Sequence, residues 1–562
     1  MAASHCFDRI ASNDDVMIYI YNFLNFGDQL RLAKVNADLG RIFRHHIWPM
    51  DYDQLKLIEF DDVYIVSNGT TDTDRKLLPT RFDLLSFLHF YGDSVSELST
   101  DLTVLPVSFL RNVVKLNCHV ANGGGSIGEL VSRLPDLEDL QMDFDEDQPG
   151  AKIQILLRLV KLKTLRLRHI TVSLKAFWKI ATQLPLEILE LGLSPQISAR
   201  SHSLKPHGQN SALRELTISE QRIDNKMPTL LSKFENLEVL TISLRGRFSS
   251  EMLALQKLNR LTIEYSDFSL MSYLKLPPNL ETLHLRHCAE LSLDELQQFL
   301  HEHSKPRLIE FVSVGTPFGI KTIRDIQISS HLQRLDIEGL DMDQFREPFA
   351  KNSALQNLSL HPSTGFIIGI NFITIRSLKF CQNLHTLDMA GQHLALDTLL
   401  NLRNLQRISL LLILPNQWFY LMSILQELPL LRYIKVQQIR SSDSIPPPPV
   451  MTNIENLMIF NLVSCDEATL GFWFDMFSIN PQLQLHLSVH LESCTDVHRL
   501  IHHEKFPKLL RKIQICGFTL DCRKLRSDFD ATMSSIKYTI IDYSRQYPAE
   551  LKCNVILSRN KV

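Results

Sequence analysis

The sequence predicts an α/β solenoid shaped as a horseshoe, with parallel strands on the concave face and helices on the convex face. Three observations lead to this prediction. A six-residue motif with apolar residues at positions one, four and six recurs along most of the 562-residue chain. Helical apolar periodicity follows most copies, as in LSLDELQQFLHEH at 291–303. A segment without the motif, residues 1–50, precedes the repeats and predicts a small all-α domain.

The motif recurs with a nearly constant period. Strong copies begin at residues 137, 162, 186, 213, 237, 258, 280, 332, 355, 384, 405, 431, 454 and 510, and weaker copies begin at 113, 308 and 483. The 397 residues from 113 to 510 divide into 16 periods of about 25 residues. This period lies in the range of leucine-rich repeats, which run to about 20–29 residues.

Strand geometry explains the motif. Side chains alternate between the two faces of a strand, so the fourth and sixth residues point the same way. In LETLHL at 280, Leu280, Leu283 and Leu285 therefore form core. One repeat cannot bury its leucines alone, and stacking on neighbours supplies the missing wall. The repeats resemble leucine-rich repeats, and LETLHLRHCAELSLDEL is similar to their cysteine-containing subclass.

Residues 12–43 predict helices that are not part of the repeats. Ser12 or Asn13 is a candidate N-cap, and Asp14 and Asp15 in the first turn suit the helix dipole. The apolar residues predicted on one face of this helix are Val16, Ile20, Phe23 and Leu24. A turn is predicted at 25–28.

Two further helices are predicted after this turn. Leu30 and Ala33 begin the second helix, and the third runs from Asp38 towards Trp48.

This segment resembles an F-box, whose pattern is a Leu-Pro pair, an acidic pair, an apolar helix, a turn, a second apolar helix and a Trp. The sequence departs from that pattern at Ser12-Asn13, which occupy the Leu-Pro positions, and at Leu39, where the Trp is expected. The resemblance implies binding to the adaptor subunit of the SCF ubiquitin ligase. The residues implied to contact the adaptor are Val16, Ile20, Phe23, Leu24 and Leu30. The alternative is a plain helical cap for the solenoid.

Four regions follow from these patterns. We expect an F-box-like helical domain at 1–50, a connecting segment and N-terminal cap at 51–94, the leucine-rich repeat solenoid at 95–530, and a C-terminal cap or tail at 531–562. Within the second region, 67–80 predicts a loop, and 82–100 predicts a helix entering the first strand.

Composition argues against several classes of function. The net charge of −3 gives no reason to expect a nucleic-acid or membrane partner. The N-terminus does not read as a signal peptide, because Asp8 and Arg9 precede any apolar run. The nine scattered cysteines are therefore expected to be reduced thiols, and the protein to be cytoplasmic, nuclear or both.

No pattern of catalytic residues stands out, so we expect no enzyme and no cofactor. Cys494, His498 and His502 share a helical side and could suit zinc, but structural zinc usually takes two close ligand pairs, which favours a polar convex helix. The glycines at 123–125 lack the Lys-Ser/Thr of a phosphate loop, and the prolines near 441–450 favour a loop insertion over a peptide ligand for SH3 or WW domains.

Binding is expected on the outward strand positions of the concave face. The charged candidates for substrate binding are Arg260, His284, Arg286, Asp336, Glu338 and Asp388, and the apolar candidates are Tyr433, Met458 and Phe460. Mixed charge favours a protein partner over a polyanion, and exposed aromatic residues suit a binding hot spot. The alternative is that loops or the C-terminal segment cover the apolar group.

Two hypotheses of function follow. The resemblance implies the substrate-recognition subunit of an SCF-type cullin–RING ubiquitin ligase, which binds the adaptor, and through it a cullin, by the F-box and a protein substrate by the repeats. Such a receptor acts by proximity and performs no chemistry itself. The alternative is a leucine-rich repeat scaffold or inhibitor that works by protein–protein interaction without a ligase.

Overall fold

The computed structural model separates into two compact units, Met1–Asp267 with Tyr273–Asn279, and Phe268–Ser272 with Leu280–Val562, and each is described by itself. The residues that the structure describes are 13–52, 54–60, 63–68, 75–101, 107–120, 127–149, 153–193, 210–220, 231, 233–243, 255–265, 277, 279–288, 291–292, 308–316, 318–319, 330–340, 347–362, 374–390, 393–413, 415–439, 448, 450–462, 471–472, 475–476, 478–480, 483–490, 512–517, 536–542 and 553–559.

The first unit begins with a helical head. Its elements are α2 (Asp14–Tyr21), α3 (Phe26–Ala33), α4 (Ala37–Ile42), a π-helical turn (Phe43–Ile47) and α5 (Trp48–Asp51). An asparagine caps each of the first three helices: the side chains of Asn13, Asn25 and Asn36 accept hydrogen bonds from backbone N–H groups in the first turn that follows. These bonds satisfy donors that a helix leaves unpaired, so each helix start is encoded locally.

The structure corrects one detail of the predicted head. The segment 25–28 is not a free turn, because Asn25 caps α3 and Phe26 begins it as a fully buried side chain. The buried residues of α2 are Met17 and Tyr21, one helical turn apart, so Val16 and Phe23 of the predicted apolar face are left exposed.

Three antiparallel strands and a helix connect the head to the repeats. They are β1 (Gln54–Phe60), β2 (Val63–Asn68), β3 (Arg75–Leu78) and α6 (Arg81–Tyr91). β2 pairs with both β1 and β3, while β1 pairs in parallel with β4 (Glu97–Thr100) and so joins the repeat sheet. The predicted loop at 67–80 contains β3, whereas the prediction that 82–100 is a helix entering the first strand is confirmed by α6 and β4.

Aromatic side chains join the head to this cap. The ring of Trp48 stacks on Tyr52 with centroids 4.9 Å apart, and Trp48 Nε1 donates a hydrogen bond of 2.8 Å to the Tyr91 carbonyl oxygen. Phe26 from α3 and Phe87 from α6 pack on the same indole, with centroids 6.1 and 5.4 Å away. The core of the head is thus continuous with the core of the cap.

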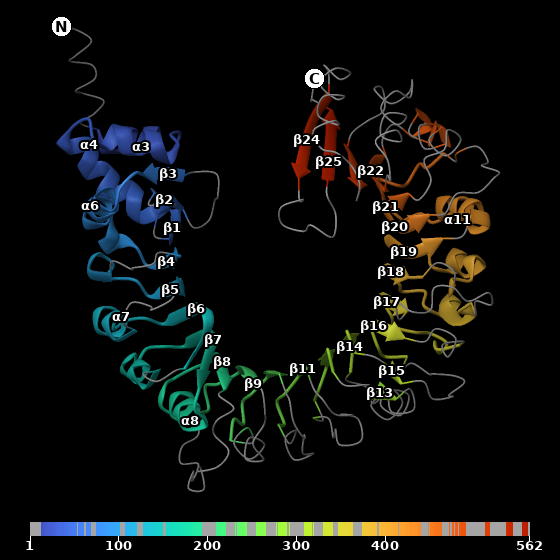
Figure 1. The fold of residues 1–562 in the computed structure, drawn as a ribbon, viewed down its shortest axis with the longest axis horizontal. Helices are drawn as coiled ribbons and strands as arrows, with labels where there is room; N and C mark the ends of the chain where they lie inside the picture. The colour runs from blue at the N-terminus through green and yellow to red at the C-terminus, as the bar shows by residue number, and fades with distance from the viewer. Residues whose placement is uncertain are drawn as a thin grey trace. The chain divides into compact units, whose positions relative to one another are not determined.

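The repeats of the first unit form a parallel sheet. Its further strands are β5 (Lys115–Val120), β6 (Asp139–Pro149), β7 (Thr164–Val172), β8 (Ile188–Leu193), β9 (Glu215–Glu220), β10 (Val239–Ser243) and β11 (Arg260–Glu264). Each pairs with the next at matching motif positions, so Leu140, Leu165 and Leu189 lie side by side and fully buried. The helices α6, α7 (Ile127–Arg133) and α8 (Leu174–Gln183) lie on one side of these strands (Figure 1).

The second unit continues the pattern. Its parallel strands are β12 (Thr282–Arg286), β14 (Glu310–Val314), β16 (Arg334–Leu340), β17 (Asn357–Pro362), β18 (Thr386–Met389), β19 (Arg407–Ile413), β20 (Tyr433–Ile439), β21 (Asn456–Leu462), β22 (Gln484–His490) and β23 (Lys512–Gly517). A small second sheet pairs β13 (Leu291–Ser292) with β15 (Phe318–Gly319). The helix α11 (Pro415–Gln426) follows β19.

The described C-terminal residues form strands. β24 (Ile536–Asp542) and β25 (Cys553–Arg559) are antiparallel, and β25 lies between β23 and β24 in the sheet. The sequence predicted either a cap or a tail at 531–562. The described part is a cap of two strands that covers the edge of β23, the last parallel strand.

The predicted repeat is confirmed strand by strand, since a described strand begins in each of the motif copies from 113 to 510. The convex side differs more from the prediction. Several repeats carry 3₁₀ turns where α-helices were expected, as at Arg376–Phe380 and Leu396–Asn401. The copies at 384 and 405 are only 21 residues apart, which leaves little chain for an α-helix. Residues 293–303 lie outside the described residues.

Substitution of one core-facing polar residue, Ser313, is expected to increase the stability of the protein. Ser313 occupies the sixth motif position on β14, beside Leu285 and Ile337, and its buried Oγ has no hydrogen-bond partner among the described residues. Ser313→Ala should raise the free energy of unfolding by about 1 kcal/mol, because it removes an unsatisfied buried hydroxyl. Urea denaturation followed by circular dichroism measures this, with Ser409→Ala on the other sheet face as a neutral control. A loss of stability in Ser313→Ala would contradict the prediction.

Candidate protein-interaction surfaces

An apolar stripe on α2 faces solvent. Tyr19 is 65% exposed and Phe23 72% exposed, Val16 is also exposed, and Ile20 is half-buried. Their spacing of three, four and seven residues places them along one side of the helix and the turn after it. The rings of Tyr19 and Phe23 meet edge to face with centroids 4.8 Å apart. We call these four residues the α2 stripe.

The residues predicted for adaptor binding are only partly in this stripe. Val16, Ile20 and Phe23 belong to it, and Leu24 is half-buried beside it. Leu30 is a correction: it is 1% exposed in the core of the head and presents no surface to a partner. Tyr19 was missed, although it lies three residues after Val16, the spacing that should have included it.

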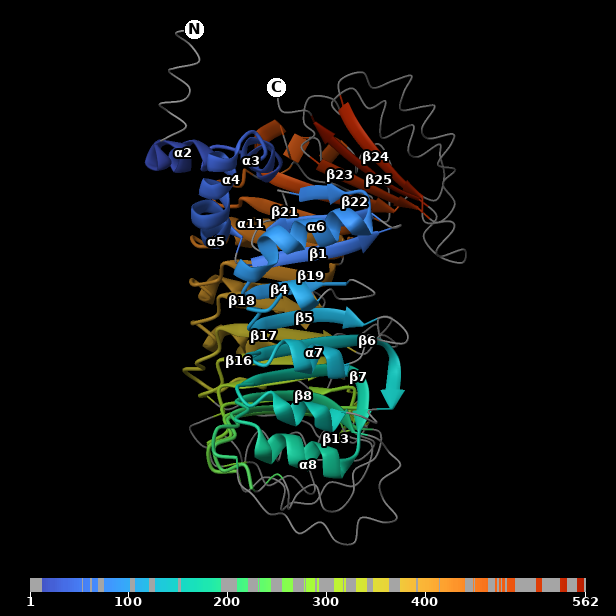
Figure 2. The same ribbon diagram turned by 90° about the vertical axis from the view of Figure 1, so that its left-hand side faces the viewer.

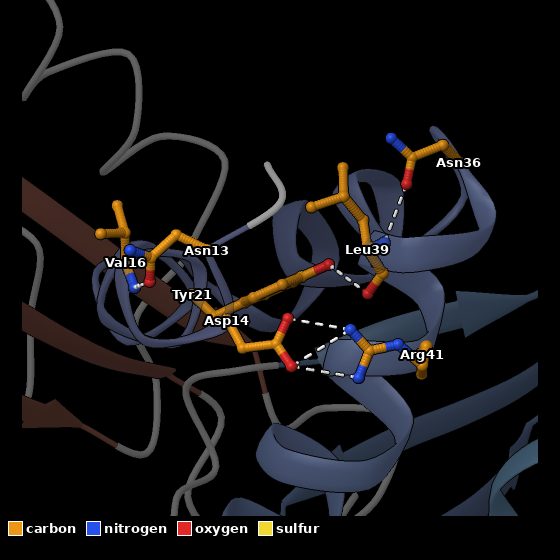
Figure 3. A network of polar contacts seen from close by, with 7 residues as sticks. All are labelled: Asn13, Asp14, Val16, Tyr21, Asn36, Leu39 and Arg41. Atoms are coloured by element: carbon orange, nitrogen blue, oxygen red, sulfur yellow. Dashed lines mark hydrogen bonds and ion pairs between the residues drawn. The ribbon is translucent and has the colours of Figure 1, made fainter. Parts of the chain in front are cut away.

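Polar contacts hold α2 on α4 (Figure 3). Arg41 donates a hydrogen bond of 2.8 Å to Asp14 Oδ1, and this bond holds the pKa of the Asp14 carboxyl below its usual range. Buried Tyr21 donates to the Leu39 carbonyl oxygen at 3.1 Å. Gln29 joins the end of α2 to the residue after α5, because its Nε2 donates to the Tyr21 carbonyl oxygen and its Oε1 accepts from the Tyr52 hydroxyl.

The fifth motif positions form in-register columns on the sheet face opposite the leucine core, which we call the open face. In the first unit one column contains Gln141, Arg166, Glu190 and Thr217. In the second unit the corresponding column contains His284, Val312, Asp336, Ser359 and Asp388. The alternation of side chains along each strand thus brings the predicted residues His284, Asp336 and Asp388 onto one surface.

Charges on the open face of the second unit pair with one another. Glu310 Oε1 lies 2.9 Å from His284 Nε2 and 3.2 Å from an Arg334 nitrogen. A second nitrogen of Arg334 lies 3.9 Å from Asp336 Oδ2. Glu310 and Arg334 were not among the predicted residues, because their partners are adjacent only after the strands align. His284 and Asp336 therefore meet through two side chains that sequence reasoning did not select.

The other predicted charges occupy separate places. Glu338 accepts a hydrogen bond of 2.9 Å from the Gly315 backbone nitrogen, so part of its role is to hold the turn after β14. Asp388 lies 3.6 Å from His361 Nε2. Arg286 is exposed at the end of β12. Arg260 belongs to β11 in the first unit, so the structure does not place the predicted basic group on one surface.

The predicted apolar group lies on β20 and β21. Tyr433 lies opposite Asn456 in the register of β20 and β21, and Met458 is two residues further along β21. The Tyr433 hydroxyl is in contact with Met458 Sδ. The guanidinium of Arg407 lies over the Tyr433 ring, 5.7 Å from its centroid. Both apolar side chains are half-buried. Phe460 lies on β21, but its side chain is outside the described residues.

Within the described part of the chain there is no group of three or more His, Cys, Asp or Glu residues suited to a metal ion. Cys494, His498 and His502 lie outside it, as do the glycines at 123–125 and residues 441–447. Burial raises the pKa of the Cys118 thiol to about 12, and it does the same for Cys381, so both are poor nucleophiles. None of the described helices has both the length and the hydropathy needed to cross a bilayer.

Comparisons with known proteins find similarity at the level of structure. Neither the protein-family models nor the curated proteins give a match. A leucine-rich repeat protein from Leptospira interrogans is 15% identical with a TM-score of 0.38, over 76% of this chain and 98% of that chain. An internalin from Listeria monocytogenes is 14% identical with a TM-score of 0.31, over 66% of this chain and 87% of that chain.

A third solved structure has the same character. The leucine-rich repeat ectodomain of a plant membrane receptor kinase from Arabidopsis thaliana is 14% identical with a TM-score of 0.30, over 75% of this chain and 62% of that chain. At such TM-scores the assignment rests on the strand register of this chain itself, whose in-register parallel strands and stacked leucines are those of a leucine-rich repeat solenoid.

Proposed function

We propose that this protein is a non-catalytic receptor that brings two other proteins together. In the specific form of this proposal it is the substrate-recognition subunit of an SCF-type cullin–RING ubiquitin ligase, acting in the cytoplasm, the nucleus or both. The helical head binds the adaptor, and the repeats bind a protein substrate. The receptor contributes proximity, since ubiquitin transfer becomes effectively intramolecular when the substrate is held nearby.

The α2 stripe is the observation that carries this proposal. A cap that serves only to cover the first repeat buries its apolar residues, and Met17, Tyr21 and Phe26 do this. The helix α2 and the turn after it also expose Tyr19 and Phe23, which are not part of the buried core. Exposed aromatic side chains on a rigid helix are typical of a protein-binding hot spot.

The open face of the second unit supports a protein substrate. Cations and carboxylates alternate there within a few ångströms, as in the group of Glu310, Arg334 and Asp336. A polyanion such as nucleic acid would be repelled by these carboxylates, whereas a protein surface can match both signs. Tyr433 and Met458 add the apolar contacts that protein interfaces favour.

A scaffold without a ligase is the second candidate, and the aromatic junction favours it. Trp48, Tyr52 and Phe87 make the core of the head continuous with the repeat sheet, which is what a terminal cap requires. In that case the α2 stripe binds a different protein or none.

Co-purification with the SCF adaptor separates the two candidates. The full-length chain is expressed with the adaptor and applied to a size-exclusion column with mass measurement. We expect a one-to-one complex that survives the column. Elution of the adaptor alone, from a receptor that is folded by circular dichroism, contradicts the ligase proposal and leaves the scaffold.

A further inference from the structure

Lys76 has an unusual position for a charged residue. It lies on β3, which pairs with β2, and it is directly opposite Val66, which in turn lies opposite Leu57. Directly opposed residues of an antiparallel sheet share a face. Val66 and Leu57 are fully buried, so Lys76 extends from the core-facing side of the sheet. Its side chain is half-buried, which places the stem on apolar neighbours and the ammonium at their margin.

Among the described residues, the charges that act on Lys76 are themselves positive. α3 packs against β3 (Figure 1), and Figure 2 shows α3 from the side. α3 carries Arg31 in its last turn and Lys34 at its C-cap. Burial, followed by the charges of Lys34 and Arg31, lowers the pKa of the Lys76 ammonium. Among the described residues, Lys76 has no hydrogen-bond or ion-pair partner.

The other two cations are only partly balanced. Arg31 donates a hydrogen bond of 2.9 Å to Asp28 Oδ1, which lies about one helical turn earlier on α3. The Arg31 side chain nevertheless remains 83% exposed. Lys34 is exposed, and its place at a helix C-terminus suits a cation. The dipole therefore explains Lys34, and the pair with Asp28 explains Arg31, whereas nothing described explains Lys76.

We propose that Lys76, Lys34 and Arg31 form a binding site for an acidic peptide segment of a protein partner. An ammonium at the margin of an apolar surface, with no partner among the described residues, loses part of its hydration, and a carboxylate that reaches it supplies a charge-assisted hydrogen bond. Arg31 and Lys34 are three residues apart on α3, which places them as neighbours about 5–6 Å apart at their Cβ atoms. Consecutive carboxylates of an acidic segment can therefore bind the exposed pair and Lys76 together.

This site is separate from the α2 stripe and does not depend on the ligase proposal. The stripe is apolar and lies on α2, whereas the three cations lie on α3 and β3. A charged edge strand can also serve only to prevent sheets of two molecules from pairing. In that role Lys76 protects against association and binds nothing.

Fluorescence anisotropy of a labelled octaglutamate peptide, titrated with the full-length chain, tests the site. At an ionic strength of about 50 mM we expect measurable binding that weakens as salt screens the charges. Lys76→Met keeps the apolar stem and should lower the affinity about tenfold. Lys175→Met, on an exposed lysine of α8, is the matched control and should bind like the wild type.

Several results overturn the proposal. The first is absence of peptide binding by the wild type, and the second is equal peptide affinity of Lys76→Met and Lys175→Met. The third is displacement of the peptide by inorganic phosphate at equal charge concentration, which indicates a site for small anions. Self-association of Lys76→Met with unchanged peptide affinity identifies the protective role instead. If Lys76→Met fails to fold, Lys34→Met replaces it with the same expected direction. Adaptor co-elution should be unchanged in each variant, which separates this test from that of the ligase.

Discussion

Replacing Trp48 with alanine should destabilise the N-terminal part of the first unit by about 3–5 kcal/mol, the usual cost of removing a large buried aromatic side chain. The indole is fully buried among rings from α3, α6 and the end of α5. Its Nε1 also donates to the Tyr91 carbonyl oxygen, so that acceptor loses its donor as well. Since the Trp48 ring contacts side chains of both the head and the cap, both should loosen together.

Hydrogen exchange resolved by peptide mass spectrometry measures this effect region by region. In Trp48→Ala we expect faster exchange across residues 14–100 and unchanged exchange in the second unit. Phe82→Ala is the matched control, because Phe82 begins the same region but is 77% exposed. Equal exchange in the two variants, or a change confined to α5, would show that the aromatic cluster is not the junction that we describe.

Substitution of the α2 stripe should abolish adaptor binding without unfolding the head. In Tyr19→Asp plus Phe23→Asp the two most exposed aromatic residues of the stripe become charged, and the buried residues of α2, Met17 and Tyr21, are untouched. A carboxylate at the centre of an apolar interface must be desolvated without a partner, which costs several kcal/mol. We therefore expect a loss of affinity of at least about a hundredfold.

The measurement is co-elution with the adaptor, with the melting curve recorded alongside. Phe82→Asp introduces the same change at an exposed phenylalanine of α6 and should keep the adaptor bound. Retention of the adaptor by the double variant would place the interface elsewhere on the head, and loss of the adaptor from Phe82→Asp as well would point to a nonspecific effect of charge.

The repeats could be predicted from the sequence because each one carries the same spacing of apolar residues. Leu140, Leu165 and Leu189 recur at one motif position, and stacking converts that recurrence into a buried column. β1, β2 and β3 were not predicted, because they occur once and have no repeat to reveal them. Their pairing depends on contacts between segments, such as Leu57 with Val66, that periodicity does not encode.

The face of α2 could not be chosen from its sequence. The run VMIYIY is apolar on every side, so helical periodicity offers two solutions, one with Val16 and Ile20 inside and one with Met17 and Tyr21 inside. The second is realised because the Tyr21 hydroxyl reaches the Leu39 carbonyl oxygen and its ring packs on Phe43. On the open face, Glu310 and Arg334 were overlooked for a related reason, since their pairing arises only from strand register.

The strand order at the C-terminal end has a consequence for biosynthesis. β25 pairs with β23, and β24 lies outside it, although β24 is translated first. The edge of β23 therefore stays open until β25 has been synthesised and has left the ribosome. A chain truncated before β25 would keep this strand edge unpaired, which favours association with other chains.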